Sequence, residues 1–247
     1  EFCCKEIKAI ICTIGGNISN QTLPYLDFNK IKENPKLFCG YSDISILHYA
    51  LLTQCNLVTF YGPCAMTQFG EYPKPLDYTI KYFLKAVSSE KPIGQITHSK
   101  QWTDEVLDWN KKIDLKKPRE LQKNYGYEWL KKGKAKGKII GGCISSIVHL
   151  RGTKYWSNHK NKILFLETPE GEKFDQGEPL YAVDSYLTDL QLSGVFKQIK
   201  GLIIGRPFRY NKEQVEKFKE IILENTKEYD FPILYGADIG HTDPQIT

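Results

Sequence analysis

The chain has 247 residues, of which 41% are apolar and 26% charged, and its formal net charge is +5. This composition is typical of a globular protein with a full core, and the mild, scattered positive charge argues against a nucleic-acid-binding protein. No apolar run approaches the length of a membrane span, so we expect no membrane partner. The seven cysteines are odd in number and show neither CxxC nor zinc spacing. They predict free thiols in the reducing cytoplasm and no metal site.

Strands and helices alternate in the first 90 residues. We expect strands at residues 7–12, 36–40 and 57–63. Helices are expected at residues 23–34, directly after Ser42, and from Asp77 onward. The last two show an apolar face at helical spacing, made by Ile44, Leu47 and Leu51 in the first and by Ile80, Phe83, Leu84 and Val87 in the second. This alternation predicts a parallel sheet covered by helices.

Periodicity fades between Ser88 and Lys138. This stretch is rich in charged residues, and long loops of this kind are often functional. We expect residues 91–135 to be a covering loop and passage between an N-terminal lobe, residues 1–90, and a C-terminal lobe, residues 136–247. In the C-terminal lobe, strands are expected at 138–142, 162–167, 201–205 and 232–240, and helices from 144, over 181–192 and over 213–224.

Ser42 follows the strand 36–40 at a sharp turn and precedes a helix. Such a turn lifts the hydroxyl clear of the sheet, and the N-terminus of the helix directs N–H groups at the place where an oxyanion would form. The stretch is similar to the G-x-S-x-G elbow, although Ile44 replaces the second glycine. Taken alone, it fits a helix cap by Ser42 or Asp43 better than a nucleophile.

A serine nucleophile needs a base, and His241 is the best placed of the five histidines. It lies just past the C-terminal end of an apolar strand, at the sheet edge where ligand sites of α/β proteins gather. Glu167, which ends the strand 162–167, is the candidate group for orienting the imidazole. The remaining histidines are expected in helices (His48, His149) or polar loops (His98, His159), and three further acids in solvated loop (Glu170, Glu172, Asp175). The pair Gly15–Gly16 fits a phosphate-binding turn, an oxyanion donor or a plain turn.

Seven segments resemble, in the same order, the serine peptidase family that contains the bacterial LD-carboxypeptidases and the microcin C self-immunity peptidases. They cover nearly the whole chain: TIGGNISNQTLPYLDF, NPKLFCGYSDIS, LVTFYGP, GKIIGGCISSI, KILFLE, GLIIGRP and GHTDPQIT. The resemblance implies an α/β fold with an N-terminal, Rossmann-like parallel-sheet lobe and a second, smaller α/β lobe. The active site is expected in the cleft between them.

The resemblance also implies the roles of individual residues. The family nucleophile falls on Ser42, the glutamate on Glu167 and the histidine on His241, so these form the expected catalytic triad. The oxyanion hole of the family is built from backbone N–H groups, which map to Asp43 and to the pair Gly15 and Gly16. The family further implies a homodimer that needs no cofactor.

Two features place the chain nearer the microcin-immunity branch. Ile14 stands where LD-carboxypeptidases commonly carry arginine before the glycine pair. The segment SKQWTDEVLDW is similar to the tryptophan-bearing loop with which the immunity peptidases stack on a nucleobase. Trp102 and Trp109 are both candidates for the stacking residue, and the alternative is that both pin the loop by packing. Base stacking suits a tryptophan because every base offers a flat π-face.

We therefore expect a serine hydrolase that cleaves an amide or acyl bond in a small peptide or in an aminoacyl- or peptidyl-nucleotide. The alternatives are an LD-carboxypeptidase that acts on murein tetrapeptides and a non-catalytic nucleotide- or peptide-binding protein. Family members normally carry a strand and helix region before the start of this chain and a short segment after its end. We therefore expect the full-length protein to be longer at the N-terminus.

Overall fold

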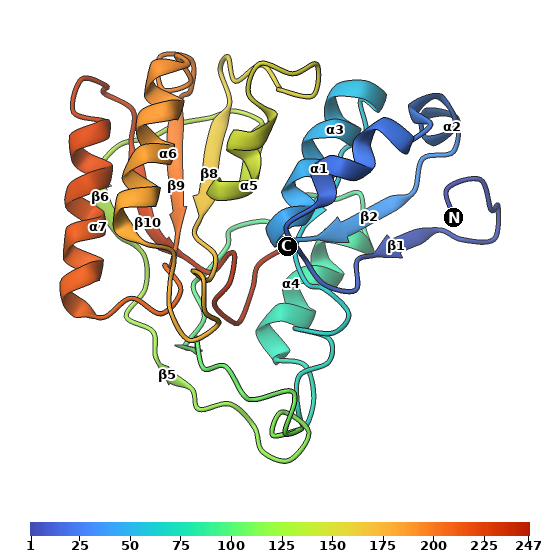
Figure 1. The fold of residues 1–247 in the computed structure, drawn as a ribbon, viewed down its shortest axis with the longest axis horizontal. Helices are drawn as coiled ribbons and strands as arrows, with labels where there is room; N and C mark the ends of the chain where they lie inside the picture. Colours follow the sequence, from blue (N-terminus) through green and yellow to red (C-terminus); the bar gives the residue numbers. More distant parts are fainter.

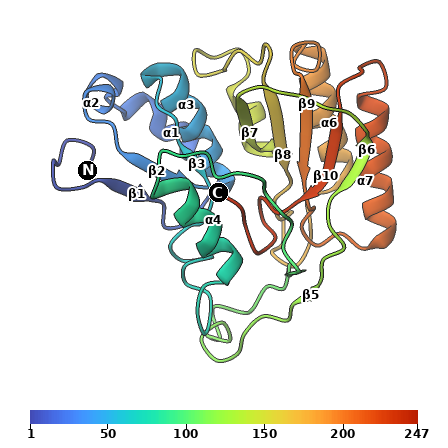
Figure 2. The same cartoon turned by 180° about the vertical axis from the view of Figure 1, so that it is seen from behind.

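Two α/β lobes stand side by side in the computed structural model, which describes residues 1–247 (Figures 1 and 2). The N-terminal lobe, blue to teal in Figure 1, holds a three-stranded parallel sheet, and the C-terminal lobe, green to red, holds a five-stranded sheet. The expected fold class is therefore correct. Its description of the second lobe as the smaller is wrong, because the C-terminal sheet has the larger number of strands.

The N-terminal sheet has the order β1-β2-β3, with all strands parallel. Its strands are β1 (Ala9–Ile11), β2 (Leu37–Gly40) and β3 (Phe60–Tyr61). The helix expected at 23–34 is broken into the 3-10 turn η1 (Leu23–Tyr25) and α2 (Phe28–Glu33), and a short helix that was not expected, α1 (Ser19–Thr22), precedes them. The break occurs because Asp27 caps α2: its side chain accepts a hydrogen bond from the backbone N–H of Lys30.

The C-terminal sheet has the order β6-β10-β9-β8-β7. Its strands are β7 (Ile139–Cys143), β8 (Ile163–Glu167), β9 (Gly201–Gly205), β10 (Ile233–Ala237) and β6 (Glu128–Lys131). All pair in parallel except β6, which pairs antiparallel with β10. The accompanying helices are α5 (Ile144–Ile147), η3 (Val148–Leu150), α6 (Leu180–Leu192) and α7 (Lys212–Asn225). Strand β6 was not expected from the sequence, because it comes from the charged stretch before residue 136.

Helix α3 (Ser45–Cys55), preceded by the 3-10 turn η2 (Ser42–Ile44), lies between the two lobes. Its buried residues Ile46, Tyr49 and Ala50 belong to the main core of 24 residues, which the C-terminal lobe dominates. On the other side, Ile44, Leu51 and Cys55 belong to the small core of the N-terminal lobe. The helix is therefore buried on two sides, whereas the sequence predicted a single apolar face.

Helix α4 (Asp77–Val87) forms where expected but buries a different face. Leu84, expected inside, is 51% exposed, while Thr79 and Tyr82 are buried. The reason is polar contact: Thr79 Oγ1 accepts the backbone N–H of Gln245 (3.0 Å), and Tyr82 Oη accepts the backbone N–H of Thr97 (3.0 Å). The spacing of apolar residues along a helix cannot predict hydrogen bonds of this kind.

The segment 91–135 runs across the lower side of the molecule in Figure 1 and contains the small antiparallel pair β4 (Gln101–Trp102) and β5 (Gln122–Lys123). It is attached to the end of the chain at Thr103, whose N–H and C=O pair with those of Asp243 (2.7 and 2.9 Å). A second attachment is Asp238, which is fully buried and accepts hydrogen bonds from Ser99 and Asn124. None of the helices has the length and apolar character needed to cross a membrane.

Candidate active site

Ser42 lies at the bend between β2 and η2, with φ at +64° and a 9% exposed surface. A positive φ is costly for a residue with a Cβ, and such residues concentrate at functional sites. Gly40, two residues before Ser42, must be a glycine for lack of space, since a Cβ there would lie 2.9 Å from Cys12 Cβ and 3.0 Å from Ile44 Cγ2. The chain therefore turns sharply and presents the Ser42 hydroxyl at the carboxyl end of the sheet.

His241 and Glu167 meet Ser42 although they are far apart in the sequence. His241 Nε2 lies 2.9 Å from Ser42 Oγ, and His241 Nδ1 lies 2.7 Å from Glu167 Oε2. Because a carboxylate only accepts, Nδ1 carries the proton and Nε2 accepts from the serine hydroxyl. Ser42 comes from the N-terminal lobe and the other two from the C-terminal lobe, so the site lies at the junction of the lobes.

Glycines allow the strand ends to approach this closely. Gly240, with φ at +89°, precedes His241, and a Cβ at this position would overlap Glu167 Oε2. Gly205, at the end of β9, is packed against Glu167 Cβ in the same way, with a hypothetical Cβ only 2.9 Å away. Both glycines therefore make room for the Glu167 side chain beside the imidazole.

The pKa of His241 is set by opposing effects. Burial alone would lower it, but the charge of Glu167 and the hydrogen bond to it, with smaller contributions from the charges of Glu170 and Asp243, outweigh burial and raise the pKa above its ordinary value of 6.5. A base with a raised pKa accepts the serine proton more readily, provided that the pH lies above that pKa.

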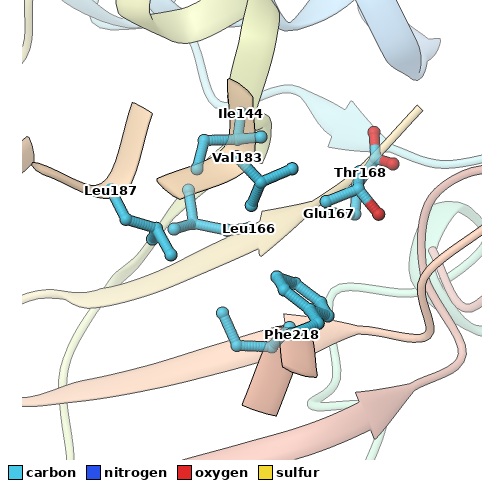
Figure 3. Close-up of a pocket in the computed structure, with 8 residues that line it drawn as sticks. Ile144, Leu166, Glu167, Thr168, Val183, Leu187 and Phe218 are labelled. Carbon is cyan, nitrogen blue, oxygen red and sulfur yellow. The ribbon is translucent and has the colours of Figure 1, made fainter. Parts of the chain in front are cut away.

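The second oxygen of Glu167 is also engaged. Tyr61 Oη donates to Glu167 Oε1 at 2.5 Å and accepts the backbone N–H of Ser42 at 3.1 Å. On its other side, Glu167 borders a small apolar cavity in the C-terminal lobe, where Ile144, Leu166 and Val183 are among its neighbours (Figure 3). That cavity is part of the core and offers no polar group for a substrate beyond Glu167 and Thr168.

The glycine pair Gly15–Gly16 lies against the serine. A Cβ on Gly15 would come within 2.7 Å of Ser42 Oγ, so the turn passes directly over the hydroxyl. Gly16, with φ at +153°, faces Asp43 Oδ2, and this oxygen holds the turn by accepting the backbone N–H of Ser19 at 2.8 Å. The backbone N–H groups of Gly15, Gly16 and Asp43 have no acceptor among the hydrogen bonds of the structure. They are therefore available to a ligand.

Of the two candidate tryptophans, Trp102 is connected to the site through Arg206. The guanidinium carbon of Arg206 lies 4.6 Å from the Trp102 ring centroid, and Arg206 also donates to Thr242 Oγ1 (3.2 Å), next to His241. Trp109 lies in a turn and is 45% exposed. One face of Trp102 is thus covered by an arginine, whereas Trp109 has a free surface.

The sequence did not predict that Tyr61 and Glu170 would lie in this site. Tyr61 was expected only as part of an apolar strand. Glu170 was assigned to solvated loop, which is wrong: its Oε2 lies 3.2 Å from His241 Nε2, although its side chain is 33% exposed. A signal for Tyr61 did exist, because it ends a parallel strand next to β2, at the edge where Ser42 and Glu167 were expected.

The other histidines make no hydrogen bond to Ser42, Glu167 or His241. His48 is buried and braces β2 against β3, with Nε2 2.9 Å from Gly40 O and Nδ1 2.7 Å from Thr59 Oγ1. His159, also buried, contacts Tyr49 Oη at 3.3 Å, while His98 bonds the carbonyl of Ser99 at 2.8 Å. His149 lies on η3. No group of three or more His, Cys, Asp or Glu side chains is arranged to hold a metal ion.

Family models match both parts of the chain. Residues 2–62 match the LD-carboxypeptidase N-terminal domain, and residues 136–247 match the LD-carboxypeptidase C-terminal domain. The Escherichia coli microcin C7 self-immunity protein MccF is 32% identical over 98% of this chain and 69% of its own length. A Bacillus subtilis protein whose name refers to murein peptide carboxypeptidase activity is 30% identical over 98% of this chain and 66% of its own length.

Solved structures are similar in fold as well. MccF in complex with glutamyl sulfamoyl guanosine superposes with a TM-score of 0.87 at 29% identity, covering 99% of this chain and 71% of that one. An MccF-like protein from Bacillus anthracis gives a TM-score of 0.83 at 39% identity, covering 97% of this chain and 69% of that one. Other solved structures of MccF contain aspartyl sulfamoyl adenosine or adenosine monophosphate.

Proposed function

The chain belongs to the LD-carboxypeptidase family of serine peptidases, and we propose that it hydrolyses an amide or acyl bond with Ser42 as nucleophile, His241 as general base and Glu167 as the group that orients the imidazole. One observation carries this proposal. The three side chains form a continuous hydrogen-bonded series, 2.9 Å from Ser42 Oγ to His241 Nε2 and 2.7 Å from His241 Nδ1 to Glu167 Oε2.

The chemistry follows from this geometry. His241 Nε2 takes the hydroxyl proton as Ser42 Oγ attacks the substrate carbonyl, and Glu167 stabilises the resulting imidazolium. When the tetrahedral intermediate collapses, the bond to the leaving group breaks and His241 gives its proton to that group. A water molecule then attacks the acyl-enzyme, with His241 taking a water proton and returning it to Ser42 Oγ. The products are a carboxylic acid, the released amine or alcohol, and free enzyme.

The oxyanion of the tetrahedral intermediate requires N–H donors in front of Ser42 Oγ. We assign this role to the backbone N–H of Asp43 and to the Gly15–Gly16 turn, in which Gly15 is the nearer to the hydroxyl. Support comes from the close approach of Gly15 to Ser42 and from the absence of protein acceptors for these N–H groups.

The favoured substrate is a small peptide joined to a nucleotide, or an aminoacyl nucleotide. The solved MccF structures that resemble this chain contain aminoacyl sulfamoyl nucleosides. Trp109, with its free surface, and Trp102, backed by Arg206, are the residues that would stack on the base. Replacing the stacking tryptophan with alanine is expected to weaken nucleotide substrates by about five- to a hundredfold, or about 1–3 kcal/mol, and to leave substrates without a base unaffected.

The second candidate is a murein carboxypeptidase that cleaves tetrapeptides between L and D residues. It is favoured by the similarity to the Bacillus subtilis relative. The third is a non-catalytic nucleotide- or peptide-binding protein that uses the same junction between lobes. Retention of Ser42, His241 and Glu167 in hydrogen-bonding geometry argues against this third reading.

A hydrolysis screen separates these candidates. Wild-type protein is incubated with aspartyl sulfamoyl adenosine and, separately, with a murein tetrapeptide, and the products are followed by mass spectrometry. Ser42→Ala is expected to reduce turnover by about 10⁶-fold while the exposed control Ser193→Ala changes nothing. Turnover by Ser42→Ala at more than a small fraction of the wild-type rate would refute the nucleophile. Binding without any turnover would favour the non-catalytic reading.

Cellular context belongs to the same proposal. We place the enzyme in the cytoplasm, because all seven cysteines are free thiols in the structure and thiols persist in a reducing compartment. We further propose a homodimer on the basis of the family resemblance, with residues 1–90 and 136–247 as lobes and residues 91–135 as the cover, whose strand β6 adds to the sheet of the C-terminal lobe. Size-exclusion chromatography with light scattering checks the oligomeric state.

A further inference from the structure

Tyr61 occupies a central place in the hydrogen bonds of the site. It ends β3 and is paired in register with Gly40 of β2, so its ring reaches the same sheet edge as Ser42. Its hydroxyl connects Glu167 Oε1 (2.5 Å) with the backbone N–H of Ser42 (3.1 Å). Together with the two bonds of His241, these contacts close a ring: Ser42 Oγ, imidazole, carboxylate, phenol, Ser42 backbone.

The direction of each bond in the ring follows from the protons available. The Glu167 carboxylate has no proton to give, so Tyr61 must donate to it. The Ser42 amide can only donate, so the tyrosine oxygen must accept from it. Burial, with the adjacent charge of Glu167 as the next cause, raises the pKa of Tyr61 well above its ordinary value, so that the phenol keeps the proton it donates.

The position of the Tyr61 ring is determined by rigid neighbours. It packs edge-on against Phe165 of β8, with ring centroids 5.0 Å apart, and at a tilt against His48, with centroids 5.7 Å apart. His48 in turn bonds Gly40 O and Thr59 Oγ1, which fixes β3 against β2. The phenol therefore contacts both lobes through groups that have little freedom to move.

We propose that Tyr61 is a positioning residue for the hydrolysis, which holds the Glu167 carboxylate with Oε2 facing His241 and holds the strained backbone of Ser42 by accepting its N–H. This inference rests on the proposed function. It has a consequence for the oxyanion hole: the Ser42 N–H is already bonded to Tyr61, so the hole is left to Asp43 and the Gly15–Gly16 turn.

Tyr61→Phe tests the proposal because it removes one oxygen and keeps the ring. It leaves Glu167 Oε1 and the Ser42 N–H without partners, and the cost of leaving such buried polar groups unsatisfied corresponds to about a 10- to 100-fold loss. We expect kcat to fall by about 10- to 100-fold, with KM nearly unchanged. Tyr49→Phe is the matched control, since Tyr49 is also buried but its hydroxyl contacts His159 in the core. It should retain wild-type activity.

A pH profile separates positioning from a general loss of structure. The imidazole of His241 is surrounded by three acids and two aromatic rings: Glu167, Glu170, Asp243, Tyr41 and Phe208. The carboxylate of Glu167 is surrounded by Tyr61, Cys143 and His241. Without the phenol, more negative charge rests on the oxygen that faces the imidazole. The acid limb of kcat/KM is therefore expected to move to higher pH in Tyr61→Phe. An unchanged limb together with unchanged kcat would overturn the proposal.

A double-mutant cycle adds a second criterion. If Tyr61 acts through Glu167, Tyr61→Phe should cost less than about threefold in a Glu167→Gln background, because coupled residues are not additive. The same loss in both backgrounds would show that Tyr61 does not position Glu167 and would refute the inference.

Amide exchange tests the contact without any variant. NMR of the wild-type protein should show the Ser42 amide at least about tenfold more protected than the Asp43 amide, and equal exchange would overturn the proposal. Failure of the proposed function looks different: wild-type protein would hydrolyse neither substrate, and Ser42 would not react with a fluorophosphonate, whatever the state of the Ser42 amide.

Discussion

Two carboxylates face the same imidazole from adjoining regions of the chain, the end of strand β8 and the loop that follows it. The Glu167 side chain is fully buried, and its two oxygens are bonded to Tyr61 and His241. Glu170 is one-third exposed and approaches His241 Nε2 at 3.2 Å. The two carboxylates therefore act on His241 in different ways. Glu167 is held in one geometry, whereas Glu170 acts through a charge that water and salt screen.

The largest expected effect distinguishes the two acids directly. Glu167→Gln should lower kcat by about 10⁴-fold, because the amide can neither hold the required tautomer nor stabilise the imidazolium. Glu170→Gln, the matched control, should stay within about tenfold of wild type at pH 8. Steady-state kinetics on the substrate found by the hydrolysis screen measure both. Comparable losses in the two variants would show that the buried and the exposed acid have the same role.

A glycine substitution tests whether the fixed geometry of Glu167 matters. Gly240→Ala places a Cβ on Glu167 Oε2 and should cost about 100-fold in kcat/KM, the usual result of a displacement near 1 Å. Gly152→Ala is the control, because Gly152 also has a positive φ (+74°) but has open space around it. Both variants share the cost of the left-handed backbone, about 1–2 kcal/mol, which thermal unfolding measures. Equal activities would mean that Glu167 adjusts freely.

The pH dependence of the wild-type enzyme reports the combined effect of Glu167 and Glu170 on the pKa of His241. His241 must be neutral to act as a base, and its pKa is raised, so kcat/KM should increase with pH through an apparent pKa above 6.5. Activity is thus lost on the acid side, where the imidazole is protonated before substrate binds. An acid limb below pH 6.5 would show that burial outweighs the carboxylates.

The smallest expected effect concerns Glu170 alone. Its charge contributes to the raised pKa of His241, so Glu170→Gln should move the acid limb of kcat/KM to lower pH. Added salt should move the wild-type limb in the same direction and the variant limb less, because the exposed charge is screened and the buried one is not. If salt moves both limbs equally, the screened charge is not that of Glu170.

The residues at strand ends were the ones that the sequence could predict. Glu167 ends an apolar strand, Ser42 and His241 lie just past the ends of two others, and parallel strands bring their carboxyl ends to one edge. Their roles as a set came from the family resemblance, since Ser42 alone fitted a cap and Glu167 alone could have faced solvent. The strand positions were predictable for the same reason: apolar runs bounded by turn residues are a local signal.

Contacts between distant polar groups were not predictable. Tyr61 acquires its place from the register of β2 with β3, and Glu170 from the return of its loop toward His241, where Glu170 pairs with Gly177. Strand β6 was missed because its residues, Glu128–Lys131, are half charged, and an edge strand needs only one apolar side. Helix α4 was found, but its buried face depends on hydrogen bonds to Thr97 and Gln245 that no period encodes.

The attachment of residues 91–135 to the chain on both sides of His241 has a thermodynamic consequence. Ser99 and Asn124 hold Asp238, three residues before the imidazole, and Thr103 pairs with Asp243, two residues after it. A displacement of the cover would therefore also move the imidazole of His241. Under the proposed function, a nucleotide that reordered the cover and an acyl group on Ser42 would be linked ligands, and each would change the binding free energy of the other by the same amount.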